Sequence, residues 1–263
     1  MTTERRVVIV FALLLIALVV NVYMFACCRA RSPAEGTSSS TSTSTSTSTS
    51  KTLTTPAPAI KLSDDYEVIE IVDLLTAEQC DAIVAAAKAA GMGNAETIDI
   101  DNVSGTYTSY NPKFRTSKTV FLPDGRLPEI ELLAAQAQTR TGLPRENQEQ
   151  LQVAHYEVEG EFKDHYDACD ASSDVCAKFN HGAGHRVATL LVYLNDDFDG
   201  GETVFPRIGK AVRPRKGKGV LFRNTDADEV ILYNSLHRAS QVTRGEKWIC
   251  TKWTHPSAFP ETI

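Results

Sequence analysis

His165-Tyr166-Asp167 lies in the second half of the chain, and a further histidine, His237, and then Lys247 follow downstream. Alternate residues of a β-strand point to the same side, so a His-x-Asp pair on a strand can aim both side chains at one metal ion. Two imidazoles and one carboxylate on one face hold non-haem Fe(II) and leave coordination positions open for substrate and oxygen. The spacing therefore makes His165 and Asp167 candidate iron ligands, and His237 is the candidate for the distant histidine.

One folded domain accounts for most of the chain. The chain has 263 residues and a formal net charge of −6, but the composition of its first sixty residues cannot build a packed core. We therefore expect a single domain at residues 61–263. Because the net charge is negative, the chain as a whole has no positive field that would attract nucleic acid. The short basic run at 213–218 is interpreted as a solvated loop. No nucleic-acid partner is expected.

An apolar segment at residues 7–26 predicts a membrane-spanning helix. Only Asn21 interrupts it, and about twenty apolar residues are enough to cross a bilayer. Two arginines precede the segment and two follow it, so the charge balance does not fix its orientation. Its length favours an uncleaved signal anchor, with residues 1–6 in the cytosol, over a cleavable signal peptide. Cys27 and Cys28 suit palmitoylation but equally suit two inert thiols.

Residues 27–60 are expected to form a disordered stalk. Ser and Thr alternate almost without break at 38–50, and prolines follow before hydrophobic patterning begins. Such a tract buries too little to offset its ordering entropy, and in a secretory compartment it can carry O-linked sugars. Together with an Asn-x-Ser sequon at Asn102, the stalk favours a lumenal domain.

Four cysteines fall within the expected domain: Cys80, Cys169, Cys176 and Cys250. In an oxidising compartment an even number permits one or two disulfides. A Cys169–Cys176 pair would close a short loop immediately after the metal motif, and we state it as a hypothesis. The spacing does not match a paired Cys-x-x-Cys zinc site, and Cys80 is interpreted as a buried helix residue.

Two helices are expected before the metal motif. Thr76 as N-cap begins an Ala-rich helix that continues to about Ala90 and stops at Gly91. A second helix is expected from about Leu127 to Thr141, because Gly and Pro follow it directly.

The remainder of the sequence predicts β-strands. Short β-branched or aromatic runs, separated by Gly, Pro, Asn and Asp, lie at 151–156, 188–194, 219–222, 230–233 and 248–253. No alternation of strands with helices is evident, so a parallel βαβ sheet is not expected. The pattern predicts a mainly β sandwich or barrel with flanking α-helices.

An ordered set of motifs resembles the prolyl 4-hydroxylase catalytic domain. It comprises Tyr-Glu-Val-Glu-Gly-Glu-Phe-Lys-Asp-His-Tyr-Asp at 156–167, Arg-Val-Ala-Thr-Leu-Leu-Val-Tyr-Leu-Asn-Asp at 186–196, Gly-Gly-Glu-Thr-Val-Phe-Pro at 200–206, His237, and Gly-Glu-Lys-Trp at 245–248. Upstream, Arg-Thr-Ser at 115–117 and Leu-Pro-Arg-Glu-Asn-Gln-Glu at 143–149 also resemble it. The likeness extends over about 65–256, nearly the whole expected domain.

The resemblance implies an Fe(II) and 2-oxoglutarate dioxygenase on a double-stranded β-helix, or jelly roll. By analogy, His165, Asp167 and His237 would be the iron ligands, and Lys247 would pair with the distal carboxylate of 2-oxoglutarate. A cation is needed there, because a carboxylate buried without a partner carries a penalty of several kcal/mol. The implied reaction uses O2 to hydroxylate peptidyl proline at C4 while 2-oxoglutarate becomes succinate and carbon dioxide, and ascorbate is implied as a further cofactor.

Three further residues are implied to bind the cofactor. Tyr156 would hydrogen-bond the same carboxylate of 2-oxoglutarate, and Thr189 and Trp253 would line its pocket. Two of them also have a purely structural interpretation: Tyr156 as a half-buried strand aromatic and Thr189 as β-branched packing. Gly200-Gly201 is interpreted as a possible turn.

Two segments depart from the family pattern. Relatives often show Gly-Gln-x-Tyr before the metal motif, whereas this chain has Gly160, Glu161 and Phe162, so a tyrosine hydroxyl that could face the peptide is absent. Residues 168–185, with two cysteines, replace a shorter link and are expected to form a lid over the site. The other histidines are not expected to be ligands: His155, His181, His185 and His255.

The chain resembles the short, membrane-anchored type of prolyl 4-hydroxylase found in plants and algae. That resemblance implies proline-rich secretory proteins as substrates, since a preformed polyproline II backbone binds an extended groove at low entropic cost. Arg115 and Arg186 would line the groove or form structural ion pairs. The expected location is the endoplasmic reticulum membrane, or the Golgi, as a single-pass type II protein with a lumenal catalytic domain.

Two alternatives remain open from the sequence. A 2-oxoglutarate dioxygenase with the same cofactors could act on a free amino acid or another side chain. A jelly-roll module that has lost its chemistry could bind peptides without catalysis, although all five expected iron and co-substrate residues are present. The oligomeric state is not predicted.

Overall fold

The structure, a computed structural model, describes residues 56–98, 108–169 and 174–260. The apolar segment at 7–26, the Ser/Thr tract and Asn102 lie outside this part of the chain. Within the described residues, no helix combines the length and apolar character needed to cross a membrane.

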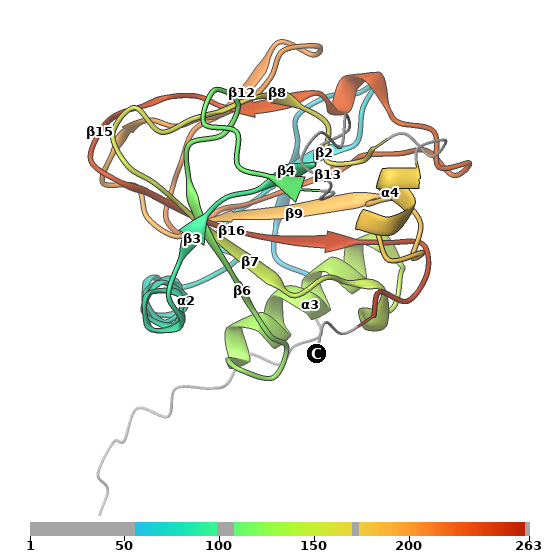
Figure 1. Cartoon of the computed structure of the whole chain (residues 1–263), viewed down its shortest axis with the longest axis horizontal. Coiled ribbons are helices and arrows are strands. Elements are labelled where there is room, and N and C mark those ends of the chain that lie inside the picture. Colours follow the sequence, from blue (N-terminus) through green and yellow to red (C-terminus); the bar gives the residue numbers. More distant parts are fainter. Residues whose placement is uncertain (1–55, 99–107, 170–173, 261–263) are drawn as a thin grey trace, which may run out of the picture. The chain divides into compact units, whose positions relative to one another are not determined.

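Two antiparallel sheets form the body of the domain (Figure 1). The major sheet contains, in spatial order, β1 (Ala59–Lys61), β2 (Val68–Ile71), β13 (Gly219–Arg223), β9 (Ala188–Tyr193), β16 (Lys247–Thr254), β7 (Leu151–Tyr156), β6 (Lys118–Leu122) and β3 (Gly93–Asn94). The minor sheet contains β12 (Lys210–Val212), β11 (Thr203–Phe205), β14 (His237–Ala239) and β8 (Phe162–His165). Two short pairs complete the strands: β4 (Thr97–Ile98) with β5 (Thr108–Ser109), and β10 (Asp199–Gly200) with β15 (Val242–Arg244).

The two sheets face each other across a hydrophobic layer. Phe205 of the minor sheet packs edge-on against Phe222 of the major sheet, with ring centroids 5.1 Å apart. Tyr156 and Ile249 of the major sheet are buried in the same cluster. This packing of two antiparallel sheets is the jelly-roll architecture expected from the sequence.

Helices cover the other face of the major sheet. In Figure 1, α2 (Ala77–Ala90) and α3 (Pro128–Thr141) lie on the side away from β8 and β12. Their buried residues join Val153, Val192 and other major-sheet residues in a second core cluster. The shorter helices are α4 (Asp174–Phe179), η1 (Arg145–Asn147) and η2 (Tyr233–Ser235).

The local signals for the two long helices are confirmed. Thr76 caps α2 through a capping box with Gln79, and the helix ends at Gly91. Helix α3 starts with Pro128 at its first position and ends at Gly142, whose left-handed conformation suits glycine. Cys80 is fully buried on α2, as expected.

Four of the five expected strands are present, but the one at 230–233 is wrong. Val230 and Tyr233 are each 60% exposed, and the segment forms only an isolated bridge between Ile231 and Thr225 before η2 begins. β-branched and aromatic residues favour a strand only where they can pack against neighbouring strands, and this segment forms a single bridge. The prediction from composition was therefore wrong here.

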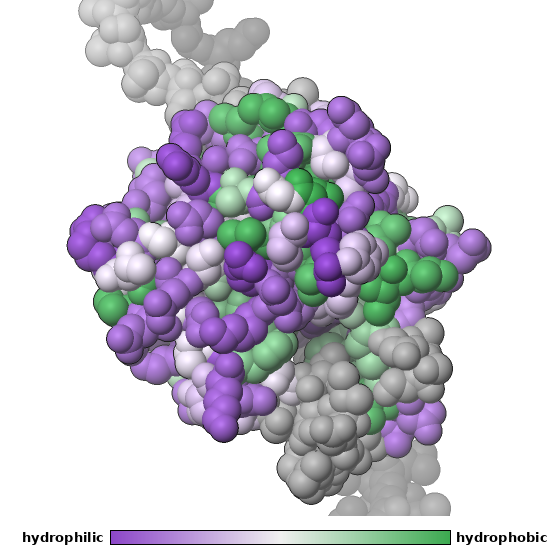
Figure 2. All heavy atoms as spheres, turned by 90° about the horizontal axis from the view of Figure 1, so that it is seen from above, coloured by the Kyte–Doolittle hydropathy of each residue, from purple (hydrophilic) through white to green (hydrophobic). Residues whose placement is uncertain are grey.

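One face of the molecule shows how its exposed residues are distributed. The face seen from above in Figure 2 is mostly hydrophilic, with hydrophobic residues in small separate clusters. This distribution is ordinary for a protein whose apolar residues are concentrated between and beneath its sheets.

Candidate active site

The three predicted metal ligands meet at one end of the minor sheet. His165 on β8 and His237 on β14 are directly opposite each other in the antiparallel pair, and Asp167 follows β8 by two residues. The Nε2 atoms of His165 and His237 lie 3.7 and 3.9 Å from the carboxylate oxygens of Asp167. One ligand atom from each residue falls within 4.8 Å of the others, and no second cluster of this kind occurs among the described residues.

The hydrogen bonds of the two histidines fix which nitrogen is free. Nδ1 of His165 lies 2.7 Å from the carbonyl of Lys163, and Nδ1 of His237 lies 2.9 Å from the carbonyl of Ser235. A carbonyl only accepts, so each Nδ1 carries the proton, and each Nε2 presents a lone pair to the carboxylate. Three acceptors that face one another in a buried site need a cation between them. The donor set therefore fits a divalent metal such as Fe(II).

Burial keeps His165 neutral and hence ready to bind a metal. The loss of solvent around the imidazole, reinforced by the nearby His237, lowers the pKa of His165 to about 3. A neutral imidazole is the form that ligates metal ions.

Two donors fix the carboxylate of Asp167. The Thr189 hydroxyl donates to Oδ2 at 2.6 Å, and the Trp253 indole N–H donates to the same oxygen at 3.0 Å. Burial by itself raises the pKa of Asp167, but the two histidines, Arg186 and the Thr189 hydrogen bond together lower it. The Asn224 amide in turn donates to the Thr189 hydroxyl at 2.8 Å. Asp167 is therefore an oriented carboxylate whose Oδ1 remains available for a metal.

Lys247 and Tyr156 face the same cavity from the major sheet. They are directly opposite each other in the β16–β7 pair, and both are almost completely buried. Lys247 Nζ donates to the carbonyl of Gly201 at 2.7 Å but forms no ion pair with any carboxylate of the described chain. Burial lowers the pKa of Lys247 to about 7, and Glu202 only partly opposes this shift. A buried ammonium with spare donors is suited to an anionic ligand.

Gly201 was expected only as part of a turn, but in the structure it lies against Phe198 and Lys247. Its φ is +66°, and a Cβ there would lie 2.7 Å from the Phe198 ring and 3.0 Å from Cδ of Lys247. Glycine thus allows the backbone carbonyl to approach the lysine closely.

The predicted residues line one cavity that opens into a larger groove. Its walls include the three ligands together with Tyr156, Thr189, Lys247 and Trp253. The adjoining groove has a volume of about 570 Å³ and shares Arg115, Gln152 and Trp253 with the cavity. Besides His165, the aromatic side chains that line it are Phe114, Phe121, Phe162, Tyr166, Phe179 and Trp253.

The two arginines named from sequence line the groove and have different partners. The Arg115 guanidinium donates to Ser117 and Gln152, both uncharged, and lies 4.7 Å from the centre of the Phe162 ring. Arg186 instead forms a two-pronged ion pair with Glu149. Arg186 therefore combines the two roles considered from sequence, since it is both an ion-pair partner and part of the groove wall.

Several residues at the site were not singled out from the sequence. Phe162 stacks on the His165 ring with centroids 3.5 Å apart, and Asn224 orients Thr189 as described above. Glu149 is buried with Arg186 and also accepts a hydrogen bond from His255. Asn224 and Glu149 act through contacts with residues distant in sequence, which no local signal marks, whereas Phe162 lies three positions from His165 on the same strand. The other histidines lie outside the metal cluster.

The fold and the donor set define a class of enzyme: the Fe(II)- and 2-oxoglutarate-dependent oxygenases. The family model for the 2OG-Fe(II) oxygenase superfamily matches residues 151–255. In this class Fe(II) held by such ligands would activate O2, and 2-oxoglutarate would be converted to succinate and carbon dioxide as the substrate is hydroxylated.

Comparison with curated proteins narrows the class, and the chain belongs to the prolyl 4-hydroxylase family. It is 34% identical over 210 residues to "Probable prolyl 4-hydroxylase 4" of Arabidopsis thaliana, covering 72% of this chain and 67% of that protein. "Prolyl 4-hydroxylase 2" of the same plant is 32% identical over 210 residues with the same coverage. A viral collagen prolyl hydroxylase from Paramecium Bursaria Chlorella virus-1, solved with 2-oxoglutarate, is 28% identical with a TM-score of 0.56, covering 71% of this chain and 94% of that one. The reaction of this family is 2-oxoglutarate-dependent hydroxylation of proline.

Proposed function

We propose that this protein hydroxylates C4 of peptidyl proline in proline-rich secretory proteins. The observation that carries the proposal is the buried Lys247 ammonium, which shares a cavity with the three metal ligands and has no carboxylate partner among the described residues. That arrangement supports a site for an anionic co-substrate beside an iron centre.

In this proposal each cavity residue has a separate task. His165, Asp167 and His237 hold Fe(II), while Lys247 pairs with the distal carboxylate of 2-oxoglutarate. The Tyr156 hydroxyl, for which the described residues provide no hydrogen-bond partner, donates to the same carboxylate.

Thr189 and Trp253 have a different role from direct contact with the co-substrate. Their hydrogen bonds to Oδ2 of Asp167 support a positioning role, in which they keep the carboxylate turned toward the metal. Both still form part of the cavity wall.

The groove supports a peptide over a free amino acid as substrate. Its volume of about 570 Å³ exceeds what a single proline fills, and its aromatic walls suit the flat pyrrolidine rings of a polyproline II segment. The peptide would run past the metal site with one proline C4 directed to it.

A lumenal location for the domain is proposed from two sequence features, the apolar segment and the stalk, and from one disulfide. Residues 7–26 would anchor the protein as a single-pass type II membrane protein, residues 1–6 would be cytosolic, and residues 27–60 would form the stalk of the domain at 61–263. The Cys169–Cys176 disulfide supports an oxidising compartment, here the endoplasmic reticulum or Golgi. Ascorbate is proposed as the reductant that accompanies the reaction.

The test measures succinate formed from 2-oxoglutarate with and without substrate. Proline-rich peptides should stimulate succinate formation and acquire 4-hydroxyproline in equal amount, while free proline should not. Stimulation by free amino acids alone would support a different dioxygenase, and peptide binding without succinate would support a non-catalytic module.

A further inference from the structure

The segment after the metal motif is tied back by a disulfide. Cys169, two residues beyond Asp167, is bonded to Cys176 of α4, and their Cα atoms are 5.9 Å apart. Cys176 is buried, so the bond lies between α4 and the body of the domain. The hypothesis that these two cysteines pair is confirmed.

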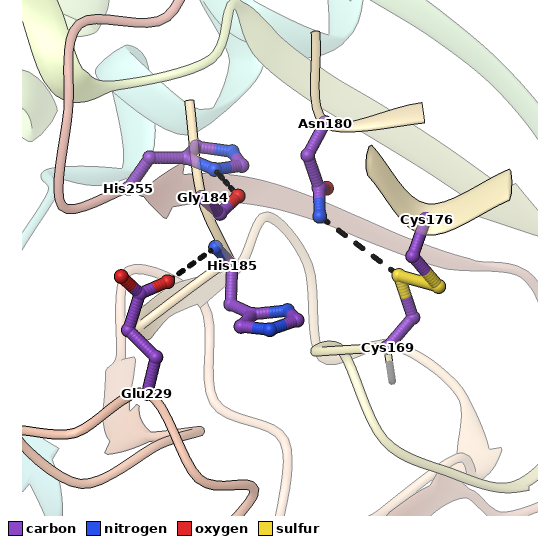
Figure 3. Close-up of a disulfide and its surroundings, with 7 residues drawn as sticks. All are labelled: Cys169, Cys176, Asn180, Gly184, His185, Glu229 and His255. Atoms are coloured by element: carbon purple, nitrogen blue, oxygen red, sulfur yellow. Dashed lines mark hydrogen bonds between the residues drawn. A yellow bond between two sulfur atoms is a disulfide. The ribbon is translucent and has the colours of Figure 1, made fainter. Parts of the chain in front are cut away.

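Further contacts fix the chain that follows α4, as Figure 3 shows. The Asn180 amide lies 3.8 Å from the sulfur of Cys169. The His255 ring bonds the carbonyl of Gly184 at 2.9 Å, and the backbone N–H of His185 donates to Glu229 at 3.0 Å. Together with the Cys169–Cys176 disulfide, these bonds attach α4 and residues 180–185 to the rest of the domain.

Gly184 allows this close attachment. Its φ is +82°, and a Cβ at this position would lie 2.5 Å from Cγ of Pro256 and 2.8 Å from a carboxylate oxygen of Glu229. A side chain would push the segment away from the domain, so the described part of the expected lid is a packed element.

The last residue of α4 belongs to the groove wall. Phe179 is half-buried and lines the groove together with Arg186 and Trp253. The Arg186 guanidinium lies 5.0 Å from the centre of the Phe179 ring and 3.7 Å from that of Trp253. Trp253 hydrogen-bonds Asp167. The three side chains thus form a continuous wall from α4 to the metal site.

We propose that Phe179 is a specificity-determining residue of the peptide groove, and that the Cys169–Cys176 disulfide preorders it for substrate. The inference rests on the proposed function, because it assumes that the groove receives a proline-rich peptide. A wall that is already ordered spares the peptide the entropic cost of ordering it. The disulfide therefore acts on peptide affinity, whereas the proposed contacts of 2-oxoglutarate, Lys247 and Tyr156, lie on β16 and β7.

The first test replaces the aromatic ring. Phe179→Ala should raise the KM for a proline-rich peptide by roughly fivefold to tenfold, the effect of losing one ordered aromatic contact, and leave the KM for 2-oxoglutarate within about twofold. Phe179→Tyr, which keeps the ring, should restore the wild-type KM. The control is Tyr110→Ala, since Tyr110 is an exposed aromatic residue that does not line the groove. Equal peptide KM values for wild type and Phe179→Ala would overturn the proposal.

The second test removes the tether while keeping the ring. The double variant Cys169→Ser/Cys176→Ser should show a similar rise in peptide KM, with peptide-independent succinate formation unchanged. If that variant does not fold, the wild-type protein treated with a water-soluble phosphine, which reduces the disulfide to two thiols, gives the same comparison. In a folded double variant the phosphine should have no further effect on peptide KM. An unchanged peptide KM in reduced protein would contradict the preordering role.

The two levels of the proposal fail in different ways. If wild-type protein shows no peptide-stimulated succinate, the proposed function is wrong. If wild type responds to peptide but the Phe179 and disulfide variants match it, only the further inference is wrong.

Discussion

Lys247 lies directly opposite Tyr156 in the antiparallel pair of β16 with β7, and its Nζ is 5.2 Å from the centre of the Tyr156 ring. The two sheets therefore contribute different functional groups to the cavity. The major sheet presents a buried ammonium and a phenol to the cavity, and the minor sheet presents the metal ligands. An anionic co-substrate can then span the space between the sheets, one end at the metal and the other at Lys247.

Removal of the ammonium should chiefly weaken 2-oxoglutarate binding. Lys247→Ala should raise the KM for 2-oxoglutarate roughly 30-fold or more, because truncating one partner of a buried charge pair costs about 2–5 kcal/mol. Steady-state succinate kinetics measure this change. Lys118→Ala, which removes an exposed lysine paired with Glu157, is the control and should leave the KM unchanged. A rise in peptide KM alone would place Lys247 outside the co-substrate site.

The same lysine should make 2-oxoglutarate binding dependent on pH. Burial lowers the pKa of Lys247 to about 7 in the unliganded protein, so the ammonium needed for binding is lost as pH rises above that value. The affinity should fall about tenfold per pH unit above about 7, and below it Lys247 should contribute no dependence. Isothermal titration calorimetry from pH 6 to 9 measures the affinity. In Lys247→Arg, whose guanidinium stays charged, the fall should disappear, and a flat wild-type profile would contradict the assignment.

The hydrogen bond from Thr189 should support metal binding. Thr189→Val removes the donor to Asp167 and leaves the Asn224 amide without its acceptor. Loss of such an outer contact typically weakens metal affinity by about 10–100-fold. Anaerobic equilibrium dialysis with Fe(II) measures the change, and Thr139→Val on the exposed face of α3 is the control. Unaltered Fe(II) affinity would reduce Thr189 to a packing residue.

The buried ion pair of Glu149 with Arg186 should make stability depend on acid. Burial opposes ionisation of Glu149, but Arg186 and His255 outweigh it and lower the pKa to about 2. The pair therefore stabilises the fold fully above the unfolded pKa of about 4.5, and this contribution declines as pH falls toward about 2. Glu149→Gln should lower the free energy of unfolding at neutral pH by about 3–5 kcal/mol, because Arg186 is left buried without its partner.

Urea unfolding at pH 7 and pH 4 measures this contribution. The matched control is Glu157→Gln, because Glu157 is paired with Lys118 at an exposed position, where an ion pair is worth about 1 kcal/mol or less. If both variants lost the same free energy of unfolding, the buried Glu149–Arg186 pair would contribute no more to stability than an exposed ion pair.

Local signals predicted the helices and long strands well. Thr76 and Gly91 bound α2 because a cap and a terminal glycine act through neighbouring backbone groups. Strand β7 spans residues 151–156, as expected from the sequence. In the major sheet it lies between β16 and β6. Strand β8 was not among the strands expected from composition, because Phe162–His165 is short and mostly polar. The His-x-Asp spacing placed His165 and Asp167 on a strand, but β8 ends at His165 and Asp167 follows it.

The metal ligands could be named because their spacing is itself a motif. His165 and Asp167 lie two residues apart, and the position of His237 followed from the family resemblance. The supporting contacts could not be named, since they join residues far apart in the chain. Asn224 bonds Thr189 across 35 positions, and Trp253 bonds Asp167 across 86.

A single iron centre formed by His165, Asp167 and His237 should carry out the hydroxylation of peptidyl proline. The most direct measurement incubates the full chain with Fe(II), 2-oxoglutarate, O2 and a proline-rich peptide, and quantifies succinate and 4-hydroxyproline by mass spectrometry. Wild type should form 4-hydroxyproline and peptide-stimulated succinate in equal amounts, and His165→Ala and Asp167→Ala should form neither. Full activity in either variant, or peptide-stimulated succinate from wild type without hydroxylated peptide, would contradict this assignment.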